Sequence, residues 1–218
     1  MTDPAPTPIG EALRQRALTI AAAHPAHPDD DPPRVSSPPR VAQRWDAIPA
    51  RFANARLADL DPGQVADELT AWSAVDGTPS NLLLVGPVGP GKTHAVLAAC
   101  RPHVDAGAVV EFVPVVDLFD RVDWRRPDSH LYLERCCSVD LLVLDDLGTE
   151  RANEWTGERL YSIVNRRWLD MLPTVATTNL NPTGADSLEA VLGERTYSRL
   201  VDGALVLRLT GRDRRRRP

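Results

Sequence analysis

The sequence predicts an α/β fold in which helices cover a doubly wound, parallel sheet of five strands. Short apolar stretches of strand length alternate along the chain with stretches of helical periodicity, a pattern typical of parallel sheets with helical crossovers. A glycine-rich motif follows the first apolar stretch, and a pair of aspartates ends the third. Because sites in such folds lie at the carboxyl ends of the strands, we expect both features at one edge of the sheet.

Residues 1–44 are predicted to form a disordered, proline-rich arm. Residues 9–23 within it carry a thin apolar stripe that suits a short helix. The stretch that follows is rich in Pro and Asp and cannot bury enough apolar surface to order itself. His24 and His27 beside three aspartates leave a metal site as the alternative to a solvated linker.

A folded domain is predicted over residues 45–211, followed by a basic tail at residues 212–218. Its first segment, WDAIPARF, has the apolar residues to pack onto a core. The expected strands cover residues 82–85, 109–113, 141–144, 173–178 and 204–209. The expected helices cover residues 62–75, 94–101, 115–122, 130–137, 153–170, 188–192 and 195–201. The longest of these helices is expected to bury Trp155, Leu160, Ile163, Val164 and Trp168.

Residues 81–93, NLLLVGPVGPGKT, contain the phosphate-binding motif G-x-x-x-x-G-K-[ST] between a strand and a helix. Its glycines let backbone N–H groups close around phosphate oxygens, and the positive end of the next helix points at the same anion. Lys92 is expected to reach the β- and γ-phosphates of ATP, and the Thr93 hydroxyl to bind Mg²⁺. The residues expected to bind the nucleotide are Gly86, Pro87, Gly89, Pro90, Gly91, Lys92, Thr93 and His94.

Two residues of this motif are unusual. Lys92 is the only lysine in the chain, so a compact ammonium is retained where a planar guanidinium would not fit. Pro90 has no N–H to offer a phosphate, which predicts weaker nucleotide binding than another residue would give.

The stretch LLVLDD ends in Asp145 and Asp146, the pattern of a Walker B strand. We expect Asp145 to support Mg²⁺ and Asp146 to polarise the attacking water. A strand that ends in an Asp-rich turn is the alternative. Asp146 stands where many such ATPases carry Glu, and its shorter side chain predicts slow turnover.

Two further polar groups are candidates for the catalytic site. Asn179 ends the fourth predicted strand, where its amide could position the same water, although an Asn that caps a turn is the alternative. Arg195 and Arg199 lie one turn apart on a late helix. Arg199 suits an arginine finger that enters a neighbouring subunit's site, with ordinary surface charge as the alternative.

Composition narrows the class of protein. The net charge of −5 argues against a generally basic nucleic-acid-binding surface, and three cysteines give neither a disulfide framework nor metal-ligand spacing. The N-terminus has no signal-peptide pattern, and no apolar run approaches the length of a membrane span. We therefore expect a cytoplasmic protein without a membrane partner.

Local basic segments remain candidates for contact with DNA. Arg212 and the run of arginines at 214–217 suit phosphates, and a solubilising tail is the alternative. A second candidate combines an aromatic residue with cations, a pairing that can stack a base. It consists of Arg121, Trp124, Arg125 and Arg126.

The chain resembles the AAA+ ATPases of the DnaC/DnaI helicase-loader and IstB transposition-helper group over residues 48–214. The resemblance rests on the segments IPARF, GPVGPGKTH, LLVLDDLGTE, EWTGERLYSIVNRRW, TTNL and ERTYSRL. It implies that Asp145 and Asp146 are the Walker B acids, that Asn179 is the sensor 1 residue and that Arg199 is the finger. It also implies an ATP- and Mg²⁺-dependent homo-oligomer, a ring or a spiral, that handles single-stranded DNA and escorts a replicative helicase. The chain has no room after its last strand for the helical lid of most AAA+ proteins, a truncation that this group shares.

Three functions are consistent with these motifs. The first is helicase loading, and the second is help to a transposase. The third is a nucleotide-gated binding module with vestigial hydrolysis. A small-molecule kinase fits less well, because the lid arginines of such kinases are not recognisable here.

Overall fold

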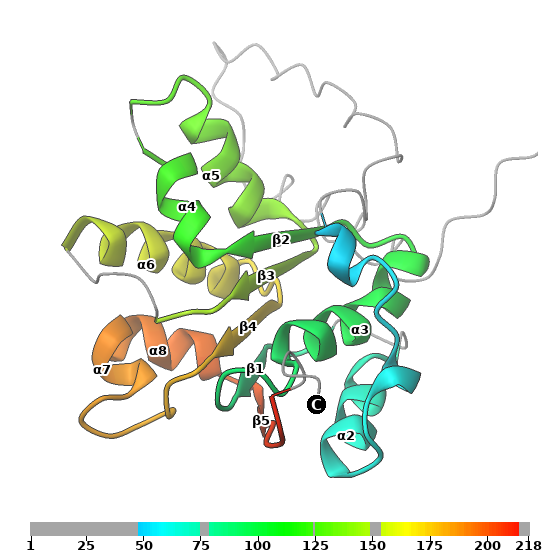
Figure 1. Ribbon diagram of the computed structural model, residues 1–218. Coiled ribbons are helices and arrows are strands. Elements are labelled where there is room, and N and C mark those ends of the chain that lie inside the picture. The colour runs from blue at the N-terminus through cyan, green and yellow to red at the C-terminus, as the bar shows by residue number, and fades with distance from the viewer. Residues whose placement is uncertain (1–47, 75–78, 124, 149–153, 214–218) are drawn as a thin grey trace, which may run out of the picture.

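The computed structural model describes residues 48–74, 79–123, 125–148 and 154–213. Five strands form one sheet in the order β2-β3-β4-β1-β5, and every neighbouring pair is parallel. The strands are β1 (Leu82–Val85), β2 (Val110–Pro114), β3 (Leu141–Asp145), β4 (Thr174–Thr178) and β5 (Leu205–Arg208). The prediction of a five-stranded parallel sheet is confirmed (Figure 1).

Helices cover both faces of this sheet (Figure 1). They are α2 (Gln64–Trp72), α3 (Lys92–Asp105), α4 (Val115–Arg121), α5 (Ser129–Ser138), α6 (Glu154–Leu169), α7 (Leu188–Leu192) and α8 (Glu194–Val201), with short 3-10 turns η1 (Ala50–Phe52) and η2 (Leu57–Asp59). Alternate residues of β1 face opposite sides, since Leu82 and Leu84 pack with α2 and α3 while Leu83 and Val85 pack with α4 to α8. Each face of the sheet therefore has its own apolar core.

The five predicted strands and the helices predicted from residue 62 onward occur in the described part of the chain, with shifts at their ends. The segment before the first long helix packs on the core as expected, because Ile48 is buried and Phe52 lies against the same cluster. The α2 helix starts at Gln64, after Pro62, and α3 extends beyond both predicted ends. The predicted arm at residues 1–44 and the residues from 214 onward lie outside the described part of the chain.

The prediction that Trp168 lies on the buried side of α6 is wrong. Leu160, Ile163 and Val164 are buried as expected and Trp155 is half-buried, but the Trp168 side chain is 40% exposed. Its indole N–H donates to a carboxylate oxygen of Asp202 at 2.7 Å. An indole satisfies its polar atom and leaves part of its ring in solvent when it lies at the end of a helix.

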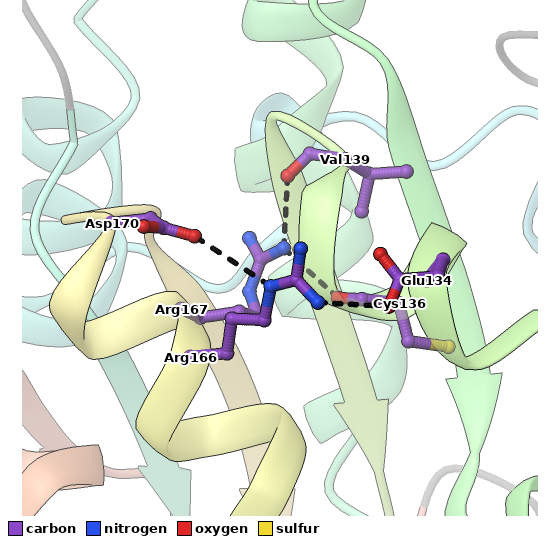
Figure 2. Close-up of polar contacts among 6 residues, drawn as sticks. All are labelled: Glu134, Cys136, Val139, Arg166, Arg167 and Asp170. Atoms are coloured by element: carbon purple, nitrogen blue, oxygen red, sulfur yellow. Dashed lines mark hydrogen bonds and ion pairs between the residues drawn. The ribbon is translucent and has the colours of Figure 1, made fainter. Parts of the chain in front are cut away.

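Near the end of α6, the side chain of Arg167 is fully buried. The sequence pattern of this helix does not distinguish Arg167 from its neighbour Arg166. Arg167 donates to the carbonyl oxygens of Cys136 at 3.0 Å and Val139 at 2.9 Å (Figure 2). It also donates to the carbonyl oxygen of Pro173 at 2.7 Å. Burial lowers the pKa of its guanidinium to about 10, so it stays charged at neutral pH. One side chain thus fixes α6 to the end of α5 and to the start of β4, while Arg166 pairs with Glu134 at the surface.

Among the described residues, no helix combines the length and the apolar composition that a membrane crossing requires.

Candidate nucleotide-binding site

The glycine-rich loop leaves the carboxyl end of β1 and leads directly into α3. Gly91 is the N-cap of this helix, with φ 103°, and has no side chain that could accept a hydrogen bond from the first N–H groups. These groups therefore face the loop, as in sites that bind anions. A Cβ on Gly86 would lie 2.0 Å from the carbonyl oxygen of Leu209, so only glycine fits at the start of the loop.

The ammonium of Lys92 lies inside the loop and is 6% exposed. It donates to the carbonyl oxygens of Gly86 at 3.0 Å and Pro87 at 2.8 Å, and to Asn179 Oδ1 at 2.6 Å. The strand order explains the last contact. Because β4 is inserted between β1 and β3, Asn179 at the end of β4 falls between the loop and the aspartate pair.

Asp145 ends β3 and faces the first turn of α3. Its carboxylate accepts hydrogen bonds from the Thr93 hydroxyl at 2.9 Å and from the Thr177 hydroxyl at 2.7 Å. Burial raises the pKa of Asp145, while these two donors counteract the shift. A hydroxyl beside a buried carboxylate is the oxygen donor set that Mg²⁺ uses when phosphates and water complete its shell.

Asp146 adopts a left-handed backbone conformation, with φ 58°. Its N–H donates to the Thr177 hydroxyl at 2.9 Å, and its side chain lines the same cavity as Lys92 and Asn179. Asp and Asn visit this conformation more readily than Glu does. The backbone thus gives a physical reason for Asp at a position where Glu is common.

A cavity of about 270 Å³ opens over the loop. Its lining joins the predicted residues Gly89, Gly91, Lys92, Thr93, His94, Asp146 and Asn179 to Arg51, Phe52 and Val88. Arg51 and Phe52 come from η1, so the core-packing segment also forms one wall of the site. Sequence reasoning missed this role, because a lone Arg-Phe pair before a helix has no distinctive spacing. The available signal was Ile48, an apolar residue three positions before Arg51 in the segment that was expected to pack on the core.

Pro90 is buried on the outer side of the loop. It lines a second groove, with the segment Arg208–Arg212, and its Cβ would lie 3.9 Å from a Cβ on Gly211. Asp213 continues this contact, since a Cβ on Gly89 would meet its carboxylate. The proline therefore lies against the segment after β5 and is absent from the lining of the cavity over the loop.

Arg199 is absent from the cavity. Its carbonyl oxygen accepts from the Asn81 side chain at 3.4 Å, and Asn81 stands immediately before β1. The phosphate-binding loop follows the other end of that strand. Arg199 thus lies at the opposite end of β1 from its own chain's site.

The candidate DNA-binding arginines at residues 121–126 lie among aspartates in the sequence. Residues 115–128 contain three arginines and four aspartates. Arg121 stacks on Tyr132 at 5.1 Å, and Arg125 pairs with Asp123. Trp124 and the arginine run at 214–217 lie outside the described residues. The described side chains of this segment do not form a surface of one charge sign.

The site fits ATP and Mg²⁺ by its own chemistry. The glycines leave space for a bulky anion, the helix terminus and Lys92 supply positive charge, and Thr93 with Asp145 supplies hard oxygen ligands. Among the described residues no group of three or more His, Cys, Asp or Glu side chains could hold a metal by itself.

A parallel sheet with this strand order and this site defines an ATP-binding protein of the AAA+ class. The chain belongs to the family of IstB-like ATP binding proteins, whose model matches residues 49–217. YdaV of Escherichia coli K12 is 31% identical over 67% of this chain. The replicative helicase loader DnaC of the same organism is 28% identical over 57% of this chain.

Solved structures agree on the fold. The crystal structure of the DnaC helicase loader superposes with a TM-score of 0.66 at 25% identity, over 74% of this chain and 100% of that one. The chain spans little more than half the length of the two relatives, 56% of YdaV and 51% of DnaC.

Replacement of Asp145 by Asn is expected to raise the melting temperature of the ligand-free chain at neutral pH. Burial holds the pKa of Asp145 above the ordinary value of 3.8. The stability that the protonated form gives is therefore lost as the pH rises through the raised pKa. An amide stays neutral and keeps an oxygen for Thr93 and Thr177.

Thermal melts of both chains at several pH values check this. The difference in melting temperature should shrink as the pH falls below 3.8. Asp105→Asn, a change at an exposed side chain, is the control. A parent chain that is the more stable of the two at neutral pH would contradict the argument.

Proposed function

We propose that this chain is an ATPase that assembles head-to-tail on single-stranded DNA and loads a replicative helicase. The observation that carries the proposal is the separation of two halves of a site. Lys92, Asp146 and Asn179 line one cavity, whereas Arg199 lies at the opposite end of β1. A site divided in this way needs a second copy to be complete.

Each residue has a role that follows from its position. Lys92 binds the β- and γ-phosphates after it leaves the loop carbonyls and Asn179. Thr93 and Asp145 would hold Mg²⁺, which would supply positive charge to neutralise the phosphates. Asp146 orients the attacking water from a side chain that its left-handed backbone aims into the cavity, and Asn179 positions the same water.

The placement of Arg199 supports head-to-tail assembly. A contact between the Arg199 surface of one copy and the cavity of the next is heterologous, so repetition produces a ring or an open spiral. The net charge of −5 argues against a general attraction to nucleic acid, so contact with DNA would depend on a local basic surface.

Similarity to DnaC supports a replicative helicase as the partner, since DnaC is a replicative helicase loader. The second candidate is help to a transposase, which the match to the IstB-like family favours. Purified helicase and purified transposase, each tested for ATP-dependent binding to this chain, separate the two. A chain that binds neither, yet switches its assembly with ATP, would be the nucleotide-gated module.

Asp146→Asn is expected to bind ATP as the parent does and to hydrolyse it at least about 100-fold more slowly, the scale of one lost general base. Asn keeps the left-handed backbone at this position, so the loop should not change. With ATP, the variant should stay assembled on a single-stranded oligonucleotide while the parent disassembles.

Turnover assays and sedimentation with single-stranded and duplex oligonucleotides check both parts. Asp105→Asn, a change at an exposed acid at the other end of α3 from the loop, is the control for loss of charge. If Asp146→Asn hydrolyses ATP at the parent's rate, Asp146 does not take part in hydrolysis. Equal assembly on both oligonucleotides, or on neither, would remove single-stranded DNA from the function.

A further inference from the structure

The guanidinium of Arg199 is held between two aromatic rings of α6. It lies 5.1 Å from the ring centre of Tyr161 and 5.3 Å from that of Trp168. These two residues are seven positions apart, so they lie on one face of the helix two turns from each other. Both rings are partly exposed, and the cation is half-buried between them.

No acidic side chain in the described part of the chain pairs with Arg199. Its Nη1 donates to the carbonyl oxygen of Arg195 at 3.1 Å, while its Nε is buried and has no hydrogen-bond partner there. An arginine that is partly removed from water usually has a carboxylate or phosphate partner. The aromatic faces substitute for one here by attracting the cation electrostatically.

The ring of Trp168 is itself held by a hydrogen bond. The indole of Trp168 donates to Asp202, and the side chain of Asn81 donates to the carbonyl oxygens of both Arg199 and Asp202. Asn81 also accepts from the N–H of Thr174 at the start of β4. Backbone and side chain of Arg199 are thus tied to the amino ends of β1 and β4, and this geometry limits the directions in which the guanidinium can move.

We infer that Trp168 and Tyr161 are positioning residues that hold the Arg199 guanidinium ready for a phosphate group in the site of a second copy of this chain. The inference rests on the proposed function, because it deepens the role of Arg199. A free arginine side chain loses much rotamer freedom when it engages an anion, and the two rings remove part of that loss in advance.

Trp168→Leu is therefore expected to lower ATP turnover of the assembled chain roughly 3- to 30-fold, the range of one cation–π contact. Tyr161→Leu should lower it by a similar factor. Trp168→Phe and Tyr161→Phe keep an aromatic face and should recover most of the rate. Leu169→Ala, a change at an exposed neighbour of Trp168, is the matched control.

Two readouts separate positioning from a general loss of structure. A single Trp168→Leu chain should bind ATP with the parent's affinity, since its own cavity is intact. In sedimentation with ATP, its midpoint concentration for assembly should rise by a similar factor, with little change in ADP. This second readout does not depend on hydrolysis.

Mixing provides the decisive result. Trp168→Leu mixed with Lys92→Ala should regain turnover, because the second chain offers a well-held Arg199 to the intact cavity of the first. Trp168→Leu mixed with Arg199→Ala should gain nothing. No gain in the mixture with Lys92→Ala, despite normal assembly, would mean that Trp168 acts on its own chain and would overturn the inference.

The same assays distinguish this inference from the proposed function. If Arg199→Ala turns over ATP at the parent's rate, the proposed role of Arg199 is wrong and the inference falls with it. If Arg199→Ala is impaired and rescued by Lys92→Ala while Trp168→Leu behaves as the parent, only the inference is overturned.

Discussion

Arg199→Ala is expected to bind ATP normally as a single chain and to hydrolyse it about 10³-fold more slowly at every protein concentration, the lower end of the effect of an arginine finger. The physical reason is its position. Arg199 lies at the opposite end of β1 from its own cavity, so its loss leaves that cavity intact.

Nucleotide titration and turnover measured over a range of chain concentrations check this. Arg195→Ala is the matched control, since Arg195 is exposed on the same helix one turn away and lends Arg199 only a backbone carbonyl. Arg199→Lys should recover little, because an ammonium lacks the planar fork and stacks poorly between two rings. A lower ATP affinity of the single Arg199→Ala chain would place Arg199 in its own site.

Lys92→Ala is expected to weaken ATP binding at least about 100-fold. Hydrogen bonds to charged groups are worth about 1.5–3 kcal/mol each, and Lys92 is placed to make more than one with phosphate oxygens. The change also leaves the carbonyl oxygens of Gly86 and Pro87 and the Asn179 side chain without their present donor.

Calorimetric titration with ATP and with ADP tests this expectation, and circular dichroism shows whether the chain stays folded. Lys92→Arg should also bind poorly, because the ammonium lies within 3.0 Å of three acceptors in a space that a guanidinium overfills. ATP affinity within a few-fold of the parent would exclude Lys92 from phosphate binding.

Motifs with strict spacing predicted their part of the site well. The G-x-x-x-x-G-K-[ST] motif and the Asp pair each follow a buried strand, and parallel strands bring their carboxyl ends to one edge. The contacts between Thr93 and Asp145, and between Lys92 and Asn179, follow from that geometry. The strand order itself was not predictable, because apolar periodicity does not say which strands are neighbours.

Features that depend on tertiary packing could not be predicted from the sequence. Arg166 and Arg167 are adjacent and alike in type, yet only Arg167 points between α5 and β4 and is buried. Trp168 fits the apolar stripe of α6, but the helix ends there and its ring meets Arg199 instead of the core. Arg51 reached the cavity only because η1 packs beside the loop.

The left-handed backbone conformation of Asp146 could not be predicted from the sequence either. A short acidic side chain suggested slow turnover, whereas the structure shows a conformation that favours Asp or Asn over Glu. Side-chain length was therefore only part of the reason for that residue.

In the proposed assembly, one copy of the chain completes the nucleotide-binding site of the next copy. The most direct test mixes Lys92→Ala, which keeps Arg199, with Arg199→Ala, which keeps the cavity, and measures ATP turnover on a single-stranded oligonucleotide. We expect turnover well above that of either variant alone, because an intact cavity can then meet an intact Arg199. A mixture that co-assembles in sedimentation yet stays as inactive as its components would contradict the claim.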